Sequence, residues 1–106
     1  MATRFIAGTE IQVDDEGFMT DAGEWNQDIA AAIAAEEGIP ELTADHRAVI
    51  DWAREAARGM GWKSPTVRQV TLGTGINTKR LFELFPKGPA KKVARISGLR
   101  KPDGCV

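Results

Sequence analysis

The residue best suited to chemistry is Cys105, the penultimate residue and the only cysteine in a chain of 106 residues. A thiol so close to the end of a chain has little use in packing, since free cysteines otherwise tend to be buried as small hydrophobic residues. Its nucleophilic form is the thiolate, which neighbouring cations favour and the terminal carboxylate of Val106 disfavours. We interpret Cys105 as a thiol presented for reaction, against the alternative that it is an incidental tail residue.

The cysteine and histidine counts exclude several classes of protein. One cysteine cannot form an intrachain disulfide, and together with the single histidine, His46, it cannot complete the usual four-ligand zinc site. The pair Gly73 and Gly75 follows a predicted helix rather than a strand, so it does not indicate a phosphate-binding loop. We therefore predict no metal and no cofactor.

The compartment is predicted from the same lone thiol. A single cysteine without a signal peptide is typical of the reducing cytosol. The longest apolar run, residues 29–35, is far shorter than the roughly 20 residues of a membrane-spanning helix. We expect a cytoplasmic protein with no membrane span.

The net charge of −1 conceals a strong division along the chain. Residues 1–60 hold thirteen acidic and four basic residues, whereas residues 61–106 hold two acidic and ten basic residues. Either the basic half faces an anionic partner, or the two halves attract each other across the fold. Our candidates for docking a partner, or for stabilising an anion at Cys105, are the basic residues Lys87, Lys91, Lys92, Arg95, Arg100 and Lys101.

The elements that must position these residues are mostly helical. Alternating apolar residues around Gly8 predict a β-hairpin over about residues 4–13. Apolar spacing and capping residues predict helices over residues 21–37, 43–59, 64–73, 77–85 and 89–97. Asp21 is the expected cap of the first helix, and Ser64 with Pro65 the expected start of the third. A chain of this length is expected to form one domain, residues 1–106.

Residues 98–106 form a predicted C-terminal arm. They contain two glycines and a proline, so neither a helix nor a strand is expected to persist, and such a terminus is mobile unless it is docked. Fully extended, the arm would span about 25 Å, enough to enter the active-site cleft of another protein.

Trp25, Trp52 and Trp62 are interpreted as aromatic residues of the core or its edge.

The sequence from Leu84 to Val106, LFPKGPAKKVARISGLRKPDGCV, strongly resembles the DsrC/TusE family of sulfur-carrier proteins. Upstream, the resemblance extends to residues 15–18, 25–26, 30, 42–43, 46, 49–50, 65 and 68. It implies a mostly α fold, a small orthogonal helical bundle with an N-terminal β-hairpin and a flexible C-terminal arm. In that family the penultimate cysteine carries the sulfur, and that residue here is Cys105.

Two departures from the family pattern refine this resemblance. Family members similar to the protein that serves as a substrate of the sulfite reductase carry a second cysteine in the arm. Ala94 occupies that position here. Cys105 can then bear a persulfide but cannot close an intramolecular disulfide or trisulfide. Arg100 also replaces the proline usual in the Gly-Leu-Pro-Lys-Pro motif. These departures favour a TusE-like relay or a single-cysteine DsrC paralogue.

The leading hypothesis is a sulfur carrier that accepts sulfane sulfur on Cys105 and delivers it, a stoichiometric sulfurtransferase step rather than stand-alone catalysis. The resemblance implies donors of the DsrEFH/TusBCD type and an acceptor protein, in either a tRNA 2-thiouridine pathway or a sulfur-oxidation pathway. One alternative is a non-covalent regulatory subunit of a sulfite-reductase-like enzyme. Another is a helix-turn-helix DNA-binding regulator formed by residues 65–85, with Lys79 and Arg80 at phosphates, although direct nucleic-acid binding is disfavoured.

Overall fold

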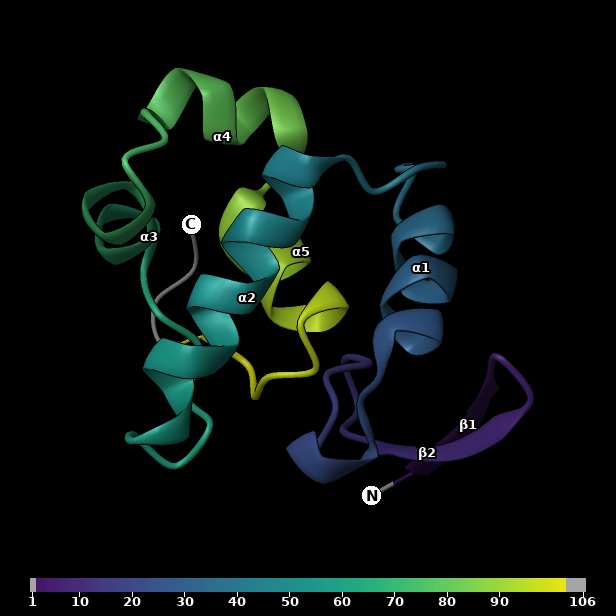
Figure 1. The fold of residues 1–106 in the computed structure, drawn as a ribbon. Helices are drawn as coiled ribbons and strands as arrows, with labels where there is room; N and C mark the ends of the chain where they lie inside the picture. The colour runs from purple at the N-terminus through teal and green to yellow at the C-terminus, as the bar shows by residue number, and fades with distance from the viewer. Residues whose placement is uncertain (1, 103–106) are drawn as a thin grey trace.

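Two strands and five α-helices make up the computed structural model, which describes residues 2–102 (Figure 1). The elements are β1 (Ala2–Ile6), β2 (Thr9–Val13), the 3-10 helix η1 (Ala22–Glu24), α1 (Gln27–Glu36), α2 (Ala44–Arg58), α3 (Val67–Thr74), α4 (Thr78–Leu84) and α5 (Pro89–Ile96). The predicted order of a hairpin followed by helices, and the mostly α fold class, are confirmed.

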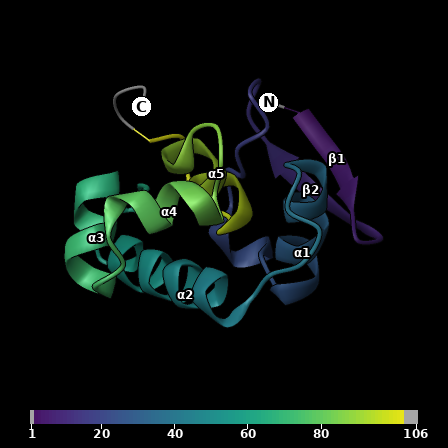
Figure 2. The same ribbon diagram turned by 90° about the horizontal axis from the view of Figure 1, so that it is seen from above.

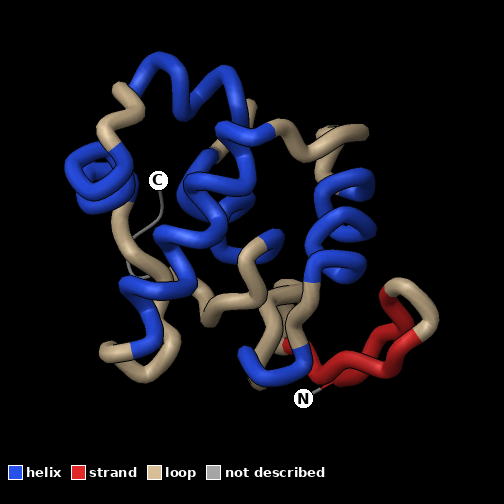
Figure 3. The backbone as a smooth tube through the Cα atoms, viewed as in Figure 1, coloured by secondary structure: helices blue, strands red, loops and turns tan. Residues whose placement is uncertain are grey.

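The hairpin is antiparallel and pairs Ala2 with Val13 and Ile6 with Thr9. Ala7 and Gly8 form the two-residue turn, and both have positive φ, as the tight hairpin turns that match strand twist require. Ile6 is buried. The hairpin lies at one end of the molecule beside α1 (Figure 3). A lone hairpin is barely stable, so this contact with the helices holds it in place.

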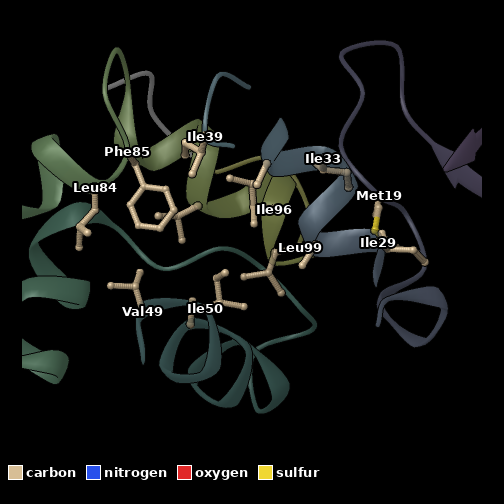
Figure 4. Packing of buried hydrophobic residues seen from close by; sticks show 14 of the residues in the cluster. Met19, Ile29, Ile33, Ile39, Val49, Ile50, Leu84, Phe85, Ile96 and Leu99 are labelled. Carbon is tan, nitrogen blue, oxygen red and sulfur yellow. The ribbon is translucent and has the colours of Figure 1, made fainter. Parts of the chain in front are cut away.

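The core lies between the helices, where α2 and α5 are flanked by α1 on one side and α3 on the other (Figure 2). Ile50 of α2 and Ile96 of α5 point toward one another in it, and Leu99 joins them from beyond the end of α5 (Figure 4). These three side chains are at most 1% exposed. Burying each contributes about 1.5–3 kcal/mol of transfer free energy.

The first helix begins later than the sequence predicted. Asp21 does act as a cap, but of the separate helix η1, where its carboxylate accepts from the N–H of Gly23. The chain is extended at Trp25, and Asn26 caps α1 by accepting from the N–H of Ile29 at 2.9 Å. The reason is tertiary: the indole Nε1 of Trp25 donates to the carbonyl of residue 96 at 2.7 Å, which draws this residue out of the helix.

The third helix also begins later than predicted. Its cap is Thr66, which exchanges hydrogen bonds with Gln69 in a capping box, instead of Ser64. The helix passes through Gly73 and ends at Gly75, whose φ of 78° is the left-handed conformation that favours glycine. The other three helices begin at Ala44, Thr78 and Pro89, in agreement with the starts predicted from the sequence.

No helix within residues 2–102 is long and apolar enough to cross a membrane. Over the same residues, no group of three or more histidine, cysteine or acidic side chains is arranged to hold a metal ion.

Candidate functional site

Cys105, the predicted reactive residue, lies outside the described residues. What the structure shows is the segment that leads to it, residues 97–102, which we call the arm base. The sequence predicts an arm from Gly98 onward that is mobile unless it is docked, and residues 98–102 are docked on the body. Ser97, Gly98, Leu99 and Pro102 are buried, and Leu99 is fully so. The apolar side chain of Leu99 is a component of the core, which holds this segment on the body.

The turn after α5 explains this course. The N–H of Leu99 donates to the carbonyl of Ala94 at 2.9 Å, and that of Gly98 to the carbonyl of Arg95 at 3.3 Å. These are the two hydrogen bonds of a Schellman motif, with its left-handed residue at Gly98, where φ is 69°. A Cβ at that position would lie 2.5 Å from the indole of Trp25. Only glycine therefore fits here.

The next residues run beside the segment that follows α2. The N–H of Arg100 donates to the carbonyl of Trp62 at 3.1 Å, and Arg100 forms a parallel bridge with Lys63. Trp62 has a φ of 64°, which is unusual for a residue with a bulky side chain. Lys101 forms an ion pair with Glu16. The arm base thus contacts both halves of the chain.

Sequence reasoning missed Arg54, which lies beneath the arm base. Its guanidinium donates to the carbonyl of Ser97 at 2.8 Å and to the carbonyl of Ala22 at 3.1 Å. Its Cζ lies 4.2 Å from the ring centroid of Trp25 and 5.1 Å from that of Trp62. Burial, and to a lesser extent Arg58, lower the pKa of Arg54 from its usual value. The signal available in the sequence was its place on α2, four residues after the buried Ile50.

Three of the six predicted docking residues are engaged within the chain. Lys92 donates to the backbone carbonyl of Glu37, whose carboxylate pairs with Arg95 at 3.0 Å. Arg95 also donates to the carbonyl of Glu16 and lies over the ring of Phe18. Lys101 pairs with Glu16, as noted above. These contacts support the interpretation that the two oppositely charged halves attract each other across the fold.

The other three docking candidates, Lys87, Lys91 and Arg100, have no side-chain ion pair among the described residues. Lys87 and Arg100 are exposed, and Lys91 is half-buried. Lys87 and Lys91 lie at the beginning of α5, whereas Arg100 follows its end. A helix of eight residues spans about 12 Å, so the three residues do not form one compact cluster.

Three further positions singled out in the sequence have structural surroundings. Ala94, at the position of the second family cysteine, is a fully buried residue of α5. His46 is 7% exposed, and both of its ring nitrogens have partners, Thr43 and the carbonyl of Leu84. Arg80 of α4 pairs with Asp45 and, within its own helix, with a second carboxylate; the hydrogen bond to Asp45 is the main cause that raises its pKa.

No sequence pattern predicted the groove that lies between α2 and α3. It has a volume of about 560 Å³, and its wall includes Trp52, Met60, Lys63 and Leu72. Leu72 is 75% exposed and Met60 61% exposed, so apolar surface remains open there.

Comparison with known proteins places this geometry in a family. Residues 5–106 match the family described as "DsrC like protein". The chain is 34% identical to the dissimilatory-type sulfite reductase subunit gamma of Nitratidesulfovibrio vulgaris over the full length of both proteins. It is 39% identical to the sulfurtransferase TusE of Salmonella paratyphi A, over 93% of this chain and 95% of the relative.

A solved structure supports the same family. The crystal structure described as dissimilatory sulfite reductase I superposes with a TM-score of 0.86 at 35% identity, covering 99% of this chain and all of the other. The family match spans nearly every element described above, including α5, the Schellman turn and the arm base. On this evidence the chain belongs to the DsrC-like family, whose relatives here are named as sulfurtransferases and sulfite reductase subunits.

Proposed function

We propose that this protein is a sulfur carrier that binds sulfane sulfur as a persulfide on Cys105 and passes it to an acceptor protein. The observation that carries the proposal is a penultimate thiol in a member of this family. The chain has one cysteine, at its penultimate position, and its family includes proteins named as sulfurtransferases. With one thiol, the load is a single sulfur atom rather than a disulfide cycle within the chain.

The loading step needs no outside oxidant. The thiolate of Cys105 attacks the terminal sulfur of a donor persulfide, R–S–SH, and forms a new S–S bond to it. The S–S bond of the donor breaks, and the donor sulfur leaves as the thiolate R–S⁻, while the proton stays on the transferred sulfur. Delivery repeats the same exchange with an acceptor thiolate. The rate depends on the thiolate fraction and on access to the sulfur, as in thiol–disulfide exchange.

The surroundings suit this role in two ways. The arm base is held on the body, and Pro102, its last residue, lies three residues before Cys105. Lys87, Lys91 and Arg100 leave positive charge on the surface, which favours an anionic partner surface or persulfide. We infer donors of the DsrEFH/TusBCD type and an acceptor in either tRNA thiolation or sulfur oxidation, in the cytoplasm.

Mass spectrometry of the intact protein tests the proposal. After incubation with a sulfane-sulfur donor such as glutathione persulfide, we expect a gain of about 32 Da, one sulfur atom. The gain should be absent in Cys105→Ser and should disappear from the wild type on reduction with a thiol. Exposure of a related TusE protein to the same donor provides the positive control. If that protein loads and this one does not, with several donors, the proposal is wrong.

The alternatives give different outcomes in parallel measurements. A DNA-binding regulator would bind duplex DNA with a steep loss of affinity as salt rises, and Cys105→Ser would bind as well as the wild type. A non-covalent regulatory subunit would bind a sulfite-reductase-like enzyme equally well with or without Cys105, and would show no sulfur transfer.

A further inference from the structure

The role of Arg54 goes beyond packing, because its contacts converge on one functional segment. We call Arg54, Trp25 and Trp62 the Arg54 clamp. The guanidinium lies against both indole rings and also donates to the carbonyl of Ser97, the first residue of the arm base. The three residues come from the loop before α1, from α2 and from the loop after α2, so only the tertiary fold brings them together.

Each aromatic member of the clamp holds a different part of the arm base. Trp25 donates from Nε1 to the carbonyl of Ile96 and packs against Gly98, where any side chain would collide with it. Trp62 accepts from the N–H of Arg100. Arg54 contacts both rings, so its removal affects the beginning and the middle of the arm base together.

An arginine suits this position for a specific reason. Its planar guanidinium can present its face to an aromatic ring while its N–H groups donate at the edge. The ammonium of a lysine is a compact charge without a plane, so it cannot replace both the stacking and the hydrogen bonds. Arg58, one turn later on the same helix, is 68% exposed at its side chain, and its ion pair is to Glu55 on the same helix. It is therefore a matched control.

We propose that Arg54 is a positioning residue that sets how far the thiol of Cys105 reaches from the body. This inference rests on the proposed sulfur-carrier function. With the clamp in place, the buried Pro102 is held on the body, and three residues of covalent chain limit the distance between its Cα and that of Cys105 to about 11 Å. Without the clamp, Leu99 in the core remains the last anchored residue, and the six residues from it to Cys105 extend the limit to about 21 Å.

The short reach has a consequence for the partner. A donor or acceptor that exchanges sulfur with Cys105 must approach to within about 11 Å of Pro102, so it must also contact the surface around the arm base. The clamp thereby confines the tethered thiol to within this distance of the arm base, which lowers the entropy lost when the complex forms.

Paramagnetic relaxation measurements test this directly, because Cys105 is the only site for a thiol-specific nitroxide label. In the full-length wild type, we expect the largest enhancements at amides around the arm base, such as those of Lys63 and Arg100. In Arg54→Ala and Arg54→Lys, the volume accessible to the label grows with the cube of the reach, so these enhancements should fall roughly sevenfold and spread over more distant amides.

The controls separate positioning from simple loss of stability. Arg58→Ala should retain the wild-type pattern. Each variant is measured at a temperature where its amide spectrum shows a folded body, and Arg54→Lys provides the milder substitution. An unchanged pattern in either folded Arg54 variant overturns the inference. Sulfur loading of the wild type is measured separately: failure to load would refute the proposed function, whereas an unchanged relaxation pattern with normal loading would refute only the role of Arg54.

Discussion

At the scale of single residues, His46 illustrates a side chain with catalytic chemistry that serves the fold. Its Nδ1 accepts from the N–H of Thr43 at 3.1 Å, and its Nε2 donates to the carbonyl of Leu84 at 2.8 Å. The first contact completes the capping box of α2, and the second joins α2 to the end of α4. The ring also meets Phe85 edge-on, with centroids 5.2 Å apart. Both nitrogens being occupied, the ring has no free position for a metal or substrate.

This arrangement predicts different losses for two substitutions of His46. His46→Ala removes both hydrogen bonds and leaves a buried carbonyl without its donor, so we expect a loss of about 2–4 kcal/mol in the free energy of unfolding. His46→Gln should lose about half as much, because glutamine at the same position completes the capping box of α3. Urea denaturation measures both. Equal losses would show that the capping contact does not contribute.

Arg54 is a second case of one side chain with several structural contacts. Its guanidinium lies against two indole rings and donates to two backbone carbonyls. Its substitution tests the reach of the thiol, whereas Cys105→Ser tests the chemistry of the thiol. The two variants therefore probe independent steps of the proposed sulfur transfer.

At the scale of elements, the contact between α2 and α3 depends on a glycine that the sequence suggested as a helix end. Gly73 lies inside α3, and a Cβ there would lie 2.0 Å from the indole of Trp52. The ring occupies the space that a side chain would fill, and it forms part of the groove wall. Close packing of the two helices, rather than a turn, accounts for the glycine.

We expect Gly73→Ala to destabilise the protein, even though alanine is favoured over glycine within a helix by about 1 kcal/mol. The reason is that Trp52 must leave its place, and its fluorescence should shift toward that of an exposed indole. In a Trp52→Ala background the collision is gone, so Gly73→Ala should then stabilise. A double-mutant cycle by urea denaturation measures this change of sign, and the same sign in both backgrounds would contradict the packing argument.

The Schellman turns show the same principle in two helices. Gly38 with Ile39 ends α1, and Gly98 with Leu99 ends α5, with equivalent hydrogen bonds and a buried apolar residue after each glycine. At the end of α5 this motif turns the chain back onto the core. For this reason the arm base is docked on the core, although its glycine and proline content predicts neither a helix nor a strand there.

At the scale of the whole molecule, the division of charge along the chain becomes a set of contacts between its halves. Asp45 pairs with Arg80, Glu37 with Arg95, and Glu16 with Lys101, always acid from the first half and base from the second. The pair between Glu37 and Arg95 is the most buried, with side chains 21% and 28% exposed. Screening by solvent therefore weakens it least.

From this we expect Glu37→Gln to lower the free energy of unfolding by about 1 kcal/mol at low salt. Part of that loss should persist at high salt, since the pair is partly buried. Glu36→Gln is the matched control, because its exposed pair with Arg4 lies within the first half of the chain. It should have a smaller effect that disappears at high salt. Thermal denaturation at two salt concentrations measures both, and a larger effect for Glu36→Gln would contradict the assignment.

Features with local causes could be predicted from the amino-acid sequence. The hairpin link at Gly8 and the caps at Thr43 and Asn77 depend on residues within three or four positions, so spacing and residue type predict them. The single thiol and its penultimate position are likewise facts of sequence, and with the family resemblance they point to sulfur chemistry.

Contacts between residues far apart in the chain depend on the tertiary fold. Trp25 leaves its expected helix because of a hydrogen bond to a carbonyl 71 residues away, and Arg95 is drawn to a carbonyl 79 residues away. Arg54 reaches the arm base across 43 residues. No local pattern encodes such partners, because they depend on how the helices pack. The packing therefore determines where the segment that leads to Cys105 leaves the body.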